Sequence, residues 1–187
     1  MAAAVELISE QGLARTTAAE IGERAGFSRE MVRTRFGSKN QLIDAMLRGQ
    51  FEDHLLEPAG ADEPGLDHWL GRLDILRKLA AEDPGLVRAS FVLSFEGAGH
   101  GSWLRTRTVD WLRRAEQAVA GFVRVGQHDG SIDPAVDPHE VAQQFLTEAV
   151  GHAFRWVCSP DDFDFDAAVR RWRDATRTRY AAGTDTI

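Results

Sequence analysis

The sequence contains a single cysteine, Cys158, only two lysines and no long hydrophobic run. One cysteine excludes both a disulfide bond within the chain and a cysteine-based zinc site. No apolar stretch approaches the roughly 18 residues that a membrane span requires. The opening residues MAAAVELISE lack the cationic start of a signal peptide. We therefore expect a cytoplasmic protein.

Patterns typical of enzymes and metalloproteins are also missing. The histidines do not follow H-E-x-x-H or another metal-binding spacing. The stretch DDFDFDA lacks the glycine and the final glutamate of a calcium loop. GAGHGS contains G-x-G, but no predicted strand precedes it, so it does not indicate a dinucleotide site. We predict that the protein is not an enzyme and that it holds no metal ion and no cofactor.

The hydrophobic pattern is helical almost throughout, and strand-like alternation is absent. Capping residues and well-placed glycines predict four short N-terminal helices, at residues 3–11, 17–25, 28–36 and 38–55. The stretch EPAGADEPG then breaks the pattern. Longer helices are predicted beyond it, from Leu66 to before Pro84 and at residues 85–97, 102–126, 138–157 and 165–180. We predict an all-α protein with a compact three-helix head and a larger helical body.

Residues 28–39, SREMVRTRFGSK, carry three arginines and one lysine against one glutamate, although the net charge of the chain is −7. On a helix, Val32 and Phe36 mark the buried side of this stretch. The side chains that then point outward or lie on the flanks are Arg29, Glu30, Met31, Arg33, Thr34 and Arg35. Such a helix suits the major groove of DNA, where arginine binds guanine, glutamate binds cytosine, and methionine contacts the thymine methyl group.

Flanking residues suit contacts with phosphate. Thr16, Thr17 and Ser38 lie at predicted helix N-termini, where free N–H groups and the helix dipole favour anions. Lys39 lies in the first turn of its helix, where a bound phosphate would explain the positive charge. The spacing alone fits equally well a solvated charged face on a small helical domain, since arginine is common throughout this chain and Glu30 repels phosphates.

The stretch ELISEQGLARTTAAEIGERAGFSREMVRTRFGSKNQLIDAML resembles the DNA-binding head of the TetR family of bacterial transcriptional regulators. The resemblance implies a helix-turn-helix at residues 17–36 within a DNA-binding domain, residues 1–47. It implies base contacts from Arg29, Glu30, Met31, Arg33 and Arg35, and support for phosphate contact from Thr17, Ser28, Thr34 and Lys39.

Glu30 stands where the family usually has a small residue, and Arg33 where it often has an aromatic one. The operator sequence therefore does not follow from the resemblance. The first helix also begins abruptly at Met1, so we expect either that some phosphate contact is missing or that the true start lies upstream.

The same resemblance implies a regulatory and dimerisation domain, residues 48–187. Family members are homodimers whose last two helices form an intersubunit four-helix bundle. Two stripes at helical spacing are candidates for this interface, and packing inside one subunit explains either stripe nearly as well. Their residues are Phe145, Ala149, His152 and Trp156 in the first, and Phe165, Val169 and Trp172 in the second.

A small-molecule effector is expected to bind in the helical body. Aromatic and polar residues near one helix junction are candidates for its pocket, although buried helices are often aromatic simply as core. These residues are Phe91, Phe95, Glu96, His100, Trp103 and Trp111. The sequence thus predicts a dimeric, ligand-responsive regulator, a repressor that binds a palindromic operator and is released by a small molecule. The alternative is a helical dimeric module that binds a ligand or a protein and has lost specific DNA binding.

Overall fold

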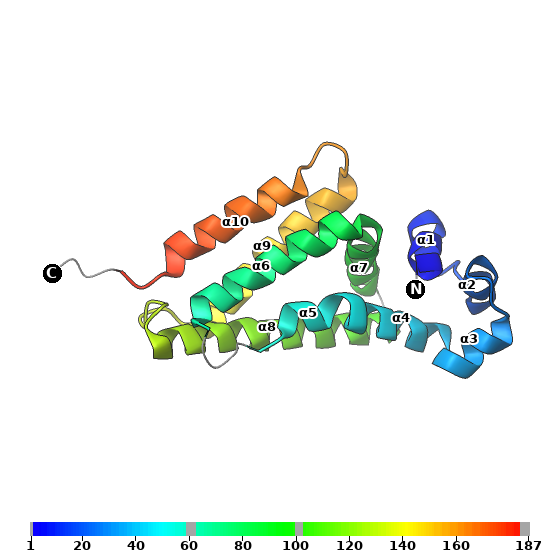
Figure 1. Ribbon diagram of the computed structural model, residues 1–187, viewed down its shortest axis with the longest axis horizontal. Helices are drawn as coiled ribbons and strands as arrows, with labels where there is room; N and C mark the ends of the chain where they lie inside the picture. The colour runs from blue at the N-terminus through cyan, green and yellow to red at the C-terminus, as the bar shows by residue number, and fades with distance from the viewer. Residues whose placement is uncertain (1, 59–62, 100–102, 184–187) are drawn as a thin grey trace.

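The computed structural model describes residues 2–58, 63–99 and 103–183, and it is helical throughout (Figure 1). Its elements are α1 (Ala2–Gln11), α2 (Ala18–Arg24), α3 (Arg29–Phe36), α4 (Lys39–Leu47), the π-helix η1 (Arg48–Glu52), α5 (Asp53–Leu56), α6 (Gly65–Glu82), α7 (Pro84–Gly97), α8 (Trp103–Asp129), α9 (Pro138–Cys158) and α10 (Phe165–Tyr180). Within the described ranges the only β pairing is an isolated bridge between Ile132 and Ala181. The all-α prediction is confirmed.

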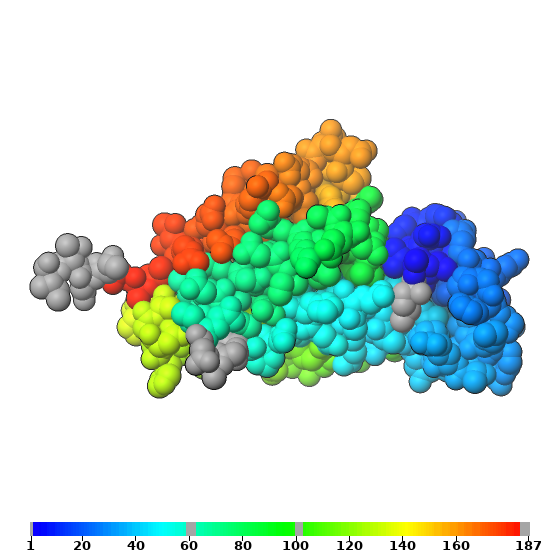
Figure 2. All heavy atoms as spheres, in the orientation of Figure 1, coloured from blue at the N-terminus to red at the C-terminus, as the bar shows by residue number. Residues whose placement is uncertain are grey.

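The molecule is elongated, with α1, α2 and α3 at one end (Figure 1). The continuous stretch α4–η1–α5 leads away from this head and runs beside the long helix α8, while α6, α9 and α10 complete the body. Figure 2 shows α3 at the outer tip of the head. No helix in the described part of the chain is long and apolar enough to cross a membrane.

Local side-chain caps explain where the short helices of the head begin. The Thr17 hydroxyl accepts a hydrogen bond from the Glu20 N–H, and the Glu20 carboxylate accepts one from the Thr17 N–H, which completes a capping box. Ser28 caps α3 and Ser38 caps α4 in the same position. Glycines with positive φ follow the three helices α1, α2 and α3, as predicted: Gly12, Gly26 and Gly37.

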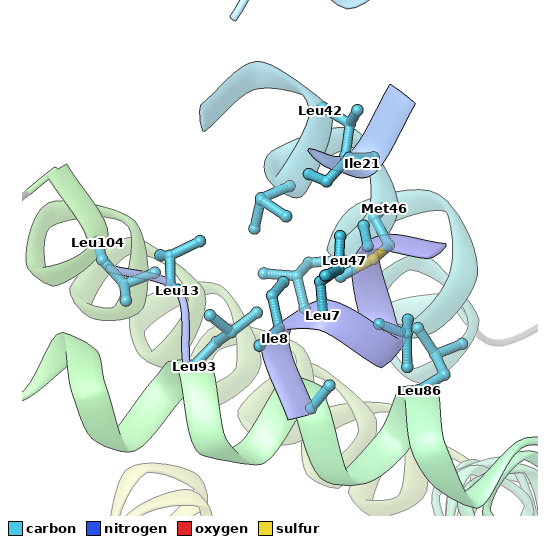
Figure 3. Packing of buried hydrophobic residues seen from close by; sticks show 14 of the residues in the cluster. Leu7, Ile8, Leu13, Ile21, Leu42, Met46, Leu47, Leu86, Leu93 and Leu104 are labelled. Atoms are coloured by element: carbon cyan, nitrogen blue, oxygen red, sulfur yellow. The ribbon is translucent and has the colours of Figure 1, made fainter. Parts of the chain in front are cut away.

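The head shares its hydrophobic core with the body. Leu7 and Ile8 of α1 pack between α4 and α7, and the same cluster includes Leu93 of α7 and Leu104 of α8 (Figure 3). The predicted boundary between residues 47 and 48 coincides with the change from α4 to η1, inside a continuous helical stretch. The division into domains 1–47 and 48–187 remains a proposal.

The predicted dimer stripes lie mainly inside the subunit. Four of their residues are buried in one intramolecular cluster with α6 and α7: Trp156, Phe165, Val169 and Trp172. Phe145 and Ala149 pack against this cluster, and the His152 ring lies 5.3 Å from that of Trp172. The assignment of these stripes to a dimer interface stays a prediction, and their burial within the subunit shows that helical spacing marks a buried face without saying which partner buries it.

Candidate nucleic-acid interface and internal cavity

Helix α3 is seated on α2 by Val32, which is buried, and by Phe36, which packs against the same core. This close packing of α3 depends on a glycine in α2, Gly22. A Cβ atom at Gly22 would lie 2.9 Å from the Phe27 carbonyl oxygen and 3.1 Å from Val32 Cγ2. A larger residue at this position would therefore collide with the turn before α3 and with Val32 of α3.

The opposite face of α3 is open to solvent. All six residues that the sequence analysis placed there are exposed: Arg29, Glu30, Met31, Arg33, Thr34 and Arg35. Met31 is 55% exposed, and Phe27 in the preceding turn is similarly exposed. Arg33 Nη2 lies 3.5 Å from Glu30 Oε1, and the Arg35 guanidinium lies over the Phe36 ring. Both contacts are at the surface, so they cost little to exchange for contacts with DNA.

Two of the flanking residues differ from the expectation for phosphate contact. Thr16 is fully buried and its hydroxyl donates to the Gly12 carbonyl, so it has no access to a phosphate. Lys39 Nζ donates to the carbonyl oxygens of Leu13, at 2.9 Å, and Thr16, at 2.8 Å. Lys39 therefore ties the turn after α1 to α4, and one of its three N–H donors is left for another partner.

The helices α1 and α2 are joined by an arginine, Arg24, whose role no motif in the sequence indicates. Arg24 donates to both carboxylate oxygens of Glu10, at 2.8 and 2.9 Å, and to Glu6 at 3.4 Å. The hydrogen bond from Arg24 lowers the pKa of Glu10. A bidentate pair of this kind orients two helices with respect to each other. Arg24 thus links α2 to α1 within the head.

The body contains a cavity of about 140 Å³ between α6, α7, α8, α9 and α10. Three residues predicted for an effector pocket line it: Phe91, Phe95 and Trp111. Five residues predicted for the dimer interface line it instead: Phe145, Ala149, His152, Phe165 and Trp172. An aromatic stripe on α9 and another on α10 therefore meet around one space inside the subunit.

Two other residues predicted for the pocket lie elsewhere. Glu96 is exposed, with its carboxylate near Gly12. Trp103 packs against the core shared by head and body. His100 lies outside the described residues. Glu96 ends an apolar run one residue before the end of α7 and is exposed there, whereas its neighbour Gly97 is buried.

A buried ion-pair cluster joins η1 to α8, and no pattern in the sequence indicates it. Glu52 is 2% exposed; its carboxylate oxygens lie 2.7 Å from Arg107 Nη2 and 2.8 Å from Arg114 Nη2. Arg107 also donates through Nε to Asp44 at 3.0 Å, and Arg114 donates to Asp110 at 3.2 Å. Phe51, the residue before Glu52, lines the cavity. The π-helix therefore contacts the cavity with one residue and α8 with the next.

Comparison with known proteins agrees with a DNA-binding role for the head. Residues 1–46 match the family model "Bacterial regulatory proteins, tetR family". The probable HTH-type transcriptional regulator ArpR of Pseudomonas putida is 29% identical, over 92% of this chain and 85% of its own. The HTH-type transcriptional regulator TtgR, also from Pseudomonas putida, is 27% identical over the same shares.

The fold is also similar to that of solved structures. A complex of SmeT with triclosan superposes with a TM-score of 0.83, covering 99% of this chain and 91% of that one at 20% identity. A second SmeT structure, described as the repressor of the Stenotrophomonas maltophilia multidrug efflux pump SmeDEF, gives a TM-score of 0.77. The relatives are transcriptional regulators and not enzymes. The head thus matches the TetR family of bacterial regulatory proteins, and the chain is similar to HTH-type transcriptional regulators over most of its length.

Proposed function

We propose that this transcriptional regulator is a homodimeric repressor that binds a palindromic operator and leaves it when a small molecule enters the body. The observation that carries the proposal is the open face of α3 at the tip of the head. Arg29, Met31, Arg33 and Arg35 all reach solvent on this face. Arginine on a recognition helix binds guanine bidentately, and an exposed methionine can contact a thymine methyl group.

A dimer is required because one recognition helix reads too few base pairs, and two half-sites about 34–36 Å apart suit two-fold symmetry. With the predicted stripes buried, the exposed apolar residues of α9 beside the cavity are the better candidate for the interface. Val150 and Phe154 are large apolar residues exposed one turn apart on this helix, and Phe154 is 56% exposed. Gly151 between them has open space around it, so a second helix can approach closely. We propose that two copies of α9 meet here.

Release by a ligand is supported by the position of the cavity beside η1. An occupant can shift the equilibrium only if it binds the DNA-bound and free forms with different affinities. SmeT, a repressor of similar fold, has been solved with triclosan, a small molecule, which supports both the repressor role and the presence of an effector here. The cavity of this chain is the candidate site, with Phe51 of η1 in its wall.

The test of DNA binding is a gel-shift titration against inverted repeats from the region upstream of the gene. We expect affinity to fall steeply between about 50 and 200 mM salt, because contacts with phosphates release counterions. Arg33→Ala should cost ~1–3 kcal/mol at one base position and relax the preference there. The matched control is Arg170→Ala, an exposed arginine of α10, which should bind DNA as the wild type does.

An absence of binding at low salt, or binding insensitive to salt, would instead favour a module that has lost specific DNA recognition. The exposed Glu30 on the reading face is the feature that fits this alternative. The dimer is tested separately by sedimentation of Phe154→Glu, which should shift the protein towards monomers. Val125→Glu, at an exposed apolar position of α8, is the control and should remain dimeric. If both variants stay dimeric, the α9 face is not the interface.

A further inference from the structure

The cavity in the body has the size of one aromatic ring. Its volume is about 140 Å³, and an engineered protein cavity of about 150 Å³ binds benzene. Its wall contains many rings, including Phe51, Phe91 and Trp111, and the Phe51 and Phe91 rings meet edge to face at 5.7 Å. A flat aromatic molecule would fit this wall through stacked and edge-to-face contacts.

The charge of the wall is positive. Among the described lining residues there is no carboxylate, and the ionisable side chains are Arg72 and His152. Burial lowers the pKa of His152, so it is neutral near pH 7 and Arg72 supplies the charge. Arg72 Nη1 donates to the His54 carbonyl at 3.1 Å and lies 3.5 Å from the Glu57 carboxylate, which is 69% exposed. This exposed, hydrated carboxylate accepts only a long hydrogen bond from Arg72 and neutralises it only weakly.

Buried hydrogen-bond donors around the cavity are unused. Trp69 and Trp172 are buried and line it, and within the described part of the chain neither indole N–H has a hydrogen-bond partner. The Nε of Arg72 is also buried without one. The Phe145 ring lies between the two indoles, 5.0 Å from Trp69 and 4.3 Å from Trp172. Unused buried donors are unfavourable, and a ligand that supplies acceptors would satisfy them.

We infer that the effector is a compact aromatic molecule carrying an anionic group, with the ring in the aromatic wall and the anion at Arg72. The inference rests on the proposed function, since it takes this cavity as the effector site. It excludes organic cations, which would meet a positive side chain and no carboxylate in the described wall. Arg72 is assigned as the residue that sets specificity, because it combines a fixed positive charge with a donor that is free to bind an acceptor.

Benzoate, benzamide and benzamidinium test this inference, because they are nearly the same shape and carry a negative charge, no charge and a positive charge. Calorimetric titration of the full-length protein should show benzoate binding at least about tenfold more tightly than benzamide, with benzamidinium weakest. Equal or tighter binding of benzamidinium would overturn the inference. So would the absence of saturation by all three probes at millimolar concentration.

Variants of Arg72 locate the preference. Arg72→Met should reduce the affinity for benzoate to that for benzamide and leave benzamide binding unchanged. Arg72→Lys should keep part of the preference for benzoate. The control is Arg177→Met, which removes an arginine that pairs with Asp67 at the surface and should keep the full preference. A preference that survives in Arg72→Met would assign the anion to another group and overturn the role of Arg72.

Gel shifts with the same probes separate this inference from the proposed function. If benzoate binds with the expected preference but operator DNA is never bound, the chemistry of the cavity stands and the regulatory proposal fails. If the operator is bound normally but none of the probes binds, the regulatory proposal stands and the effector class is wrong.

Discussion

Glu52→Gln is the most informative single change in this protein. The substitution keeps the size of the side chain and one carbonyl oxygen, and it removes a negative charge that is almost completely buried. Arg107, whose side chain is 6% exposed, then loses its closest carboxylate, and Arg114 loses one of two. The variant therefore tests whether the contact between η1 and α8 depends on charge rather than on shape.

The expected loss of stability in Glu52→Gln depends on the carboxylates that remain beside Arg107 and Arg114. Removing one partner of a buried ion pair costs roughly 3–5 kcal/mol, because the other charge stays buried without compensation. Here Arg107 keeps Asp44 at 3.0 Å and Arg114 keeps Asp110 at 3.2 Å. We therefore expect the lower end, about 3 kcal/mol of the free energy of unfolding. For a chain of this length, that loss lowers Tm by roughly 6–12 °C.

Urea and thermal unfolding at fixed protein concentration measure this loss, since a dimer's stability depends on concentration. The control is Glu82→Gln, whose partner Lys78 lies 3.9 Å away with both side chains exposed; it should change stability by less than about 0.5 kcal/mol. A loss below about 1 kcal/mol for Glu52→Gln would refute the reasoning. It would mean that the surrounding carboxylates fully compensate both arginines.

Three further predictions concern the head and the cavity. Gly22→Ala should cost about 1–3 kcal/mol of stability and weaken operator binding, because its Cβ would lie 2.9 Å from a backbone oxygen. The control Gly121→Ala, with open space around it, should stabilise α8 by roughly 0.5–1 kcal/mol. Urea unfolding measures both changes. Lys39→Met should lose about 1.5–3 kcal/mol of stability because two backbone carbonyls lose a charged donor, and an unfolding curve no worse than that of the surface variant Arg35→Met would contradict this. Burial lowers the pKa of His152 from its ordinary 6.5, so the stability linked to it is complete above about pH 6.5 and is lost as pH falls through the folded value; unfolding at about pH 7.5 and about pH 5.5 should show a smaller difference for His152→Gln than for the wild type.

The helices and the reading face of α3 could be predicted because their signals are local. A capping hydroxyl such as that of Thr17 lies three residues from its partner, and Val32 and Phe36 fix the buried side of an eight-residue helix. These relations depend only on helical geometry. The same geometry placed Met31 and the arginines of α3 on the open side, where the structure has them.

The cavity and the interface could not be predicted because they depend on which helix covers which face. The spacing of Phe145 and Trp172 marked buried stripes correctly, but it could not say that the stripes face α6 and α7 in the same subunit. Contacts that join distant parts of the chain left no pattern either. Glu52 meets Arg107 and Arg114 across more than fifty residues, and Lys39 meets carbonyl groups, which every residue has.

Helix α7 packs against α1 on one side and borders the cavity on the other. Leu86 and Leu93 support α1, while Phe91 and Phe95 border the cavity. A tilt or rotation of this helix that makes room for an occupant therefore has to carry α1 with it or leave a gap beneath the head. A fragment ending after α4 would also lack this support and expose Leu7 and Ile8 to water. The reading head should consequently be studied in the intact chain, since its orientation is set by a helix that begins almost fifty residues after α3 ends.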